Sequence, residues 1–117
     1  TDIRLSAVRG GQKGVIEVKL ADRRWALSDL ERALRNQLVG QYLRHESCRA
    51  GILLLTYDGK KIFWTHPVTR KRLKFPALVC YLQEKAHQLE VANLHGIRLG
   101  VFGLDLTDPH LEPAHRK

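Results

Sequence analysis

Alternating apolar and polar positions predict a chain of five extended segments and two helices. The extended segments, by residue number, are 2–9, 15–20, 51–57, 61–65 and 97–104. The first two alternate with the period of a strand, and the glycines between them predict a β-hairpin with a loop longer than two residues. The third is apolar throughout, which favours a central strand covered on both faces in a parallel sheet.

Helical periodicity appears twice. Apolar residues recur with the spacing of a helix over 29–45, and a capping box from Ser28 to Glu31 predicts where that helix begins. A second helix is predicted over 76–93, and its apolar positions include Val91. The order β-β-α-β-(β)-α-β therefore predicts the α/β fold class, with a mixed central β-sheet flanked by helices.

Length and composition are typical of a single globular domain. The 117 residues are 44% hydrophobic and 27% charged, enough to bury one core. We expect an α/β domain over 1–107 and a flexible tail over 108–117. The start at Thr1, without Met, predicts either the C-terminal part of a larger polypeptide or complex, or a processed chain.

The net charge and the cysteines indicate which binding partners and which cellular compartment are expected. A formal net charge of +8 favours a polyanion such as nucleic acid, although basic charge can also serve solubility alone. Cys48 and Cys80 form no paired motif, and Cys80 is interpreted as a buried small hydrophobe. A reducing, cytoplasmic location fits this usage, and no apolar run approaches the length of a membrane span.

The candidate chemistry lies in the second extended segment. If 15–20 is a strand, Glu17 and Lys19 point to one face and their apolar neighbours to the other. Asp2 would supply a second carboxylate from the adjacent strand. Two carboxylates and the Val18 carbonyl are hard oxygen ligands of the kind that bind Mg²⁺, and a lysine beside them can stabilise a pentavalent phosphate.

This constellation resembles the PD-(D/E)XK nuclease superfamily, whose core is the restriction-endonuclease-like fold. The resemblance implies that Asp2, Glu17 and Val18 bind Mg²⁺, or Mn²⁺ in its place, and that Lys19 is the catalytic lysine. It also implies that Gln37 is a further active-site contact on the following helix. The expected activity is metal-dependent hydrolysis of phosphodiester bonds, with DNA as the expected substrate and with a homodimer as one way to cut two strands.

The chain departs from the family pattern in three respects. Thr1 stands where the family has proline before the first acid, and the family's opening helix and first strand have no counterpart. In the family's glutamine-tyrosine element the tyrosine follows the glutamine by four positions, whereas here Tyr42 follows Gln37 by five. In an α-helix that spacing puts Tyr42 off the face of Gln37.

Each candidate also has a plainer interpretation. Glu17 and Lys19 can form an ion pair on the solvated face of an edge strand, and Asp2 can belong to a frayed terminus. Trp64 either stacks on a base or packs under the loop that follows it. Phosphate binding or simple solvation can explain the basic candidates, which are Arg23, Arg24, Arg32, Arg35, Arg70, Lys71, Arg72 and Lys74.

Three functions are therefore open from the sequence. The first is a Mg²⁺-dependent nuclease module, and the second is a domain of the same fold that binds nucleic acid without cleaving it. The third is a scaffold or dimerisation domain with no nucleic-acid role. Salt-sensitive binding separates the second from the third, and metal-dependent cleavage separates the first from both.

Overall fold

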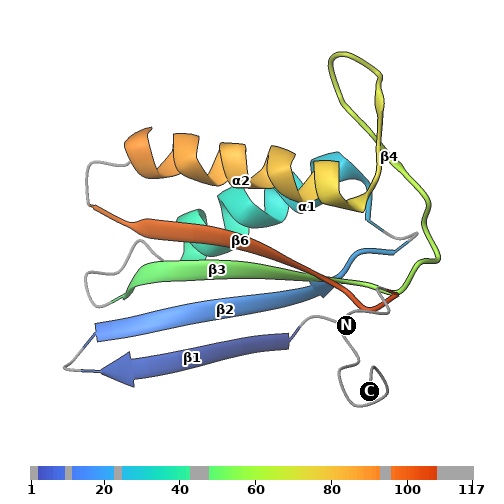
Figure 1. The fold of residues 1–117 in the computed structure, drawn as a ribbon. Helices are drawn as coiled ribbons and strands as arrows, with labels where there is room; N and C mark the ends of the chain where they lie inside the picture. The colour runs from blue at the N-terminus through green and yellow to red at the C-terminus, as the bar shows by residue number, and fades with distance from the viewer. Residues whose placement is uncertain (1–2, 10–11, 23–24, 43–47, 93–95, 108–117) are drawn as a thin grey trace, which may run out of the picture.

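The structure, a computed structural model, describes residues 3–9, 12–22, 25–42, 48–92 and 96–107. Its elements in chain order are β1 (Ile3–Arg9), β2 (Gln12–Leu20), α1 (Leu27–Arg32), η1 (Ala33–Tyr42), β3 (Cys48–Tyr57), β4 (Trp64–Thr65), β5 (Arg72–Leu73), α2 (Phe75–Ala92) and β6 (Arg98–Asp105). The predicted α/β class is confirmed: helices pack on a mixed sheet (Figure 1). The predicted tail over 108–117 lies outside the described residues.

The main sheet has the strand order β1-β2-β3-β6. β1 and β2 pair antiparallel, as the predicted hairpin requires, and β2, β3 and β6 are parallel. Each parallel pair is joined through a helical segment, and two right-handed crossovers that step in the same direction place their helices on the same face. Figure 1 shows α1 and α2 together on one side of the sheet.

The opposite face of the sheet carries no helix within the described ranges. Ile52 and Leu54 of β3 point to that face and are only half-buried, whereas Leu53 and Leu55 are fully buried on the helical face. The central place of β3 in the sheet is as predicted. The prediction that helices cover β3 on both faces is wrong for the described helices, because both crossovers lie on one side of the sheet.

The first helix begins earlier than predicted and changes type along its length. α1 starts at Leu27 and continues directly into η1, a π-helical segment. The carboxylate of Asp29 accepts a hydrogen bond from the Ala26 backbone N–H at 2.9 Å. The predicted capping box from Ser28 to Glu31 is therefore wrong by two residues, because the cap forms between Ala26 and Asp29.

The α2 helix is amphipathic, and its buried stripe faces the sheet. Leu78, Leu82 and Ala86 are buried at intervals of four residues, the spacing of one helix face. Cys80 is exposed, so its predicted burial is wrong, because it lies off that stripe. Val91, an apolar position of the predicted helix, is 72% exposed. No helix in the described ranges combines the length and apolar character needed to cross a membrane.

A small aromatic cluster joins the second, two-stranded sheet to the main one. β4 and β5 pair antiparallel, with Trp64 opposite Leu73, so Arg72, one of the basic candidates, lies on a strand. Trp64 is 1% exposed. The Tyr57 and Phe75 rings stack with centroids 4.7 Å apart, and Trp64 meets Tyr57 edge-on at 5.7 Å. This packing holds the β4–β5 hairpin against the carboxyl end of β3.

Candidate functional site

The β2 strand turns Glu17 and Lys19 toward the helices. Only 3% of Glu17 and 1% of Lys19 remain exposed, and Val15 on the same side of the strand is buried with them. Their register partners on β3 are Leu53 and Leu55. The predicted common face of the two charged residues is confirmed, whereas their interpretation as an ion pair on a solvated strand face is wrong.

Trp25 links Lys19 to the loop that follows β3. Nζ of Lys19 lies 4.3 Å from the centroid of the Trp25 ring, within the range of a cation–π interaction. The Trp25 carbonyl accepts hydrogen bonds from Nζ of Lys61 at 2.8 Å and from Nε1 of Trp64 at 3.0 Å. Trp25 therefore contacts both the buried Lys19 ammonium and the loop at the carboxyl end of the sheet.

Burial of two opposite charges makes this part of the core unusual. Moving a carboxylate or an ammonium out of water costs on the order of several kcal/mol per ion, which close partners only partly offset. Both Glu17 and Lys19 have further non-covalent contacts, so neither charge is isolated. Active sites are one setting in which charged groups are buried beside other charges.

The oxygen donors near Glu17 are of the type that suits Mg²⁺. Glu17 offers a carboxylate and Val18 a backbone carbonyl, whereas Asp2 lies outside the described residues. Ile3, which follows Asp2 in the chain, is the register partner of Val18. Within the described ranges no group of three or more His, Cys, Asp or Glu side chains could hold a metal ion. Mg²⁺ nevertheless binds through as few as one or two carboxylates when phosphate oxygens and water complete its shell.

The segment that contains Gln37 departs from α-helical geometry. η1 is π-helical from Ala33 to Tyr42, and it contacts both β2 and β3. A π-helical turn closes between residues five apart, which is the separation of Gln37 and Tyr42 in the sequence. Segments of π-helix occur frequently at functional sites.

A hollow of about 660 Å³ lies at the carboxyl ends of β2 and β3, and we name it the carboxyl-end hollow. The start of α1 forms one wall, and the chain between β3 and β5 forms the other. Lys60, Lys61 and Arg70 line it together with the apolar side chains of Ile62 and Phe63. Ligands of open α/β sheets bind preferentially at this end of the strands.

The basic run from Arg70 to Lys74 is exposed at all four of its cations, as a phosphate-binding surface requires. Arg70 lines the carboxyl-end hollow, and the Arg72 guanidinium lies 4.4 Å from the centroid of the Phe63 ring. Trp64 is buried, so packing under the loop is confirmed and base stacking by this side chain is wrong.

His66 shapes the turn that carries Arg70. Its Nδ1 accepts hydrogen bonds from the backbone N–H groups of Val68 and Thr69, each at 3.1 Å, so the proton of the neutral ring belongs on Nε2. The Arg70 N–H donates to the His66 carbonyl at 3.1 Å. His66 therefore holds this loop in place.

A second hollow of about 430 Å³, which we name the helix hollow, lies between α1, η1 and α2. Its lining includes Arg32, Arg35, Lys85 and the carboxylate of Glu31. Arg32 and Arg35 are 65% and 57% exposed, and they pair with Asp29 at 3.5 Å and with Glu31 at 3.1 Å on their own helix. These two basic candidates are therefore exposed on the helix, and part of their charge is balanced locally.

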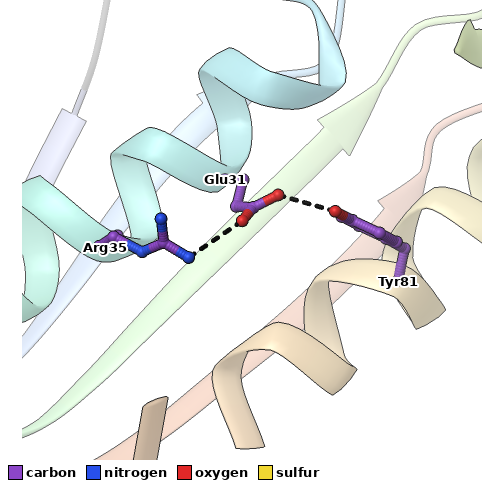
Figure 2. A network of polar contacts seen from close by, with 3 residues as sticks. All are labelled: Glu31, Arg35 and Tyr81. Atoms are coloured by element: carbon purple, nitrogen blue, oxygen red, sulfur yellow. Dashed lines mark hydrogen bonds and ion pairs between the residues drawn. The ribbon is translucent and has the colours of Figure 1, made fainter. Parts of the chain in front are cut away.

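Figure 2 shows Glu31 between Tyr81 of α2 and Arg35 of η1. The Tyr81 hydroxyl donates a hydrogen bond to Oε1 of Glu31 at 2.8 Å, and Nη2 of Arg35 donates to Oε2 at 3.1 Å. Burial of the hydroxyl, followed by its hydrogen bond to Glu31 and the charge of that carboxylate, raises the pKa of Tyr81 to about 12. The contact fixes the two helices to each other and orients Arg35.

Sequence reasoning found only part of the basic lining. Arg23 and Arg24 lie outside the described residues. Lys60, Lys61 and Lys85 were missed. The signal for the first two was their place just after the turn that ends the third predicted strand, where ligands of α/β sheets bind. Lys85 carried no comparable signal, because helical spacing alone does not separate a groove wall from an ordinary solvated face.

No protein-family model, curated protein or solved structure matches the chain. The likeness to the PD-(D/E)XK nucleases therefore rests on Asp2, Glu17, Lys19 and Gln37 themselves.

Proposed function

We propose that the chain is a Mg²⁺-dependent nuclease module with a restriction-endonuclease-like core, acting on DNA. The observation that carries the proposal is the burial of Glu17 and Lys19, 3% and 1% exposed, on one face of β2. An acid and a lysine two residues apart on a strand face are the central element of the motif that the sequence resembles.

The location of Glu17 and Lys19 supports a catalytic role for the pair more than a packing role. Leucines occupy the matching positions of β3, so this layer of the core accepts apolar side chains readily. A buried ion pair is commonly no more stabilising than apolar residues of similar volume, and it is often less so. A charged pair in such a place is therefore better explained by reactivity than by stability.

In this proposal Glu17 and the Val18 carbonyl hold the metal ion, with Asp2 as the second carboxylate. The register pair of Ile3 and Val18 places β1 beside the strand that carries Glu17 and Lys19. Bound Mg²⁺, or Mn²⁺, would supply charge neutralisation at the phosphate and an activated water. Lys19 would stabilise negative charge that develops on the phosphate oxygens.

The helix above β2 supports a role for Gln37. Its segment is π-helical and contacts the strand that carries Glu17 and Lys19. We place Gln37 as a polar contact of the active site, one π-turn before Tyr42.

The test is cleavage of linear and circular DNA with Mg²⁺ or Mn²⁺, comparing the parent with Glu17→Gln and Lys19→Met. These near-isosteric changes preserve volume, and we expect each to slow cleavage by about 100-fold or more, as loss of one group that stabilises transition-state charge does elsewhere. Arg98→Gln, an exposed change at the opposite end of the sheet, is the matched control. Parent-like cleavage by both β2 variants would refute the assigned site.

A second function, nucleic-acid binding without cleavage by the same fold, is favoured by the cationic lining of the two hollows. It predicts salt-dependent binding with no turnover at any Mg²⁺ or Mn²⁺ concentration. Cleavage that is lost with EDTA and restored with Mg²⁺ would decide for the nuclease.

A further inference from the structure

The two hollows meet at the start of α1. The carboxyl-end hollow and the helix hollow share Ser28 and Pro67 in their linings, so they adjoin each other, and we name the two together the basic groove. Its cations are Lys60, Lys61, Arg70, Arg32, Arg35 and Lys85. Among the described residues that line it, Glu31 is the only carboxylate.

We infer that the basic groove binds an unpaired stretch of nucleic acid. The inference rests on the proposed function, because it names the form of nucleic acid that the same domain binds. Proteins that bind single strands combine a cationic groove, which follows the phosphates, with apolar or aromatic side chains against which bases lie. The carboxyl-end hollow has both features, since Ile62 is 70% exposed beside Phe63, and Lys60 and Arg70 flank them.

The shape of the groove favours a single strand over a duplex. Hollows of about 660 and 430 Å³ are in the size range of small-molecule sites, and a single nucleotide can enter such a space. A duplex keeps its bases stacked inside and presents a convex phosphate surface, so it cannot bring a base to Ile62 without extruding it.

The polar contacts of the groove orient its cations before any ligand binds. Arg35 is held by Glu31, and Tyr81 in turn holds that carboxylate (Figure 2). Lys61 is held by the Trp25 carbonyl, and the ring of the same tryptophan lies over Nζ of Lys19. A nucleic-acid strand in the groove would therefore pass close to Trp25, which contacts both Lys61 in the groove and the buried Lys19.

The test measures binding of the full chain to a fluorescent single-stranded oligonucleotide and to a duplex of equal length, without divalent metal. Arg70→Gln and Arg98→Gln remove the same charge, one in the groove and one at the opposite end of the sheet. We expect Arg70→Gln to weaken single-strand binding several-fold and to reduce the slope of log K against log salt by about 0.7. Arg98→Gln should leave both values unchanged.

Ile62→Ser tests the apolar floor without a change of charge. It should weaken single-strand binding and leave duplex binding unchanged, and folding is not at risk because the side chain is mostly exposed. Tighter binding of the duplex, or equal losses from Arg70→Gln and Arg98→Gln, would overturn the inference. Displacement of the oligonucleotide by polyglutamate as readily as by an unlabelled single strand would also overturn it and would indicate an acidic protein partner.

The outcomes separate this inference from the proposed nuclease. Groove-dependent binding by a parent chain that never cleaves would refute the proposed catalysis and leave the groove standing. Cleavage and binding that Arg70→Gln and Ile62→Ser leave unchanged would refute the groove and leave the nuclease standing.

Discussion

Strands β2 and β3 present matched positions to the same helical layer with opposite chemistry. Glu17 is in register with Leu53, and Lys19 with Leu55, and all four are at most 3% exposed. η1 contacts both strands. Burial of the leucines follows from the hydrophobic effect, whereas burial of the two charges opposes it.

The difference separates positions where burial favours folding from positions where burial opposes it. Apolar side chains at positions 17 and 19 would fill similar volume without loss of hydration, and exchanges of this kind are often neutral or stabilising in other proteins. Neutral apolar residues on β3 show that the layer itself does not demand charge. Substitutions of Glu17 and Lys19 can therefore separate the effect of the pair on stability from its effect on the proposed function.

The largest effect is expected when only one of the two charges is removed. Lys19→Ala or Glu17→Ala leaves the other charge buried beside a cavity, and the free energy of unfolding should fall by about 3–5 kcal/mol. Urea unfolding followed by circular dichroism measures the loss. The exposed change Lys74→Ala is the control, and a loss as small as the control's would mean that the β2 charges are not buried in solution.

Replacing both charges together should have the opposite sign. The double substitution Glu17→Leu with Lys19→Leu makes β2 resemble β3, and we expect stability to be unchanged or to rise by about 1–4 kcal/mol. Any cleavage activity should disappear in the same protein. A double variant as unstable as the single ones would assign the pair a structural role instead.

A smaller effect is expected for the contact between Lys19 and Trp25. A double-mutant cycle with Lys19→Met and Trp25→Leu should give a coupling free energy of about 0.5–2 kcal/mol in unfolding, the range of a partly desolvated cation–π contact. Strictly additive effects would mean that the ring packs near Lys19 without interacting with its charge.

The smallest effect on stability is expected for the hydrogen bond between Tyr81 and the carboxylate of Glu31. Tyr81→Phe removes its hydrogen bond and should lower the free energy of unfolding by about 0.5–1.5 kcal/mol. Because the folded state raises the pKa of Tyr81 to about 12 from 10.0, this contribution is present below pH 10 and is lost as pH rises through about 12. Absorbance of tyrosinate should show one late-titrating group that Tyr81→Phe eliminates.

The sequence predicted the elements well where a local period carries the information. The hairpin of β1 and β2, the central place of β3, the helix from 75 to 92 and the last strand are as expected to within a few residues. It also placed Glu17 and Lys19 on one face, because alternation along a strand depends on the backbone alone.

Other features depended on neighbours that no local pattern reveals. Cys80 looks like a core residue in an apolar stretch, yet the orientation of α2 on the sheet leaves it exposed. The turn from β3 to β5 contains a second small sheet because Trp64, Tyr57 and Phe75 pack together across it. The π-helical type of η1 is likewise a property of the packed chain.

By itself, the sequence determined the order of the strands and helices and the side-by-side placement of the acid and the lysine. Only the tertiary structure decided that this face of β2 is the covered one and that cations far apart in the chain line one groove. The physical reason is that a period of two fixes which residues share a face, whereas the handedness of the crossovers fixes which face the helices cover. The burial of Glu17 and Lys19 follows from the second.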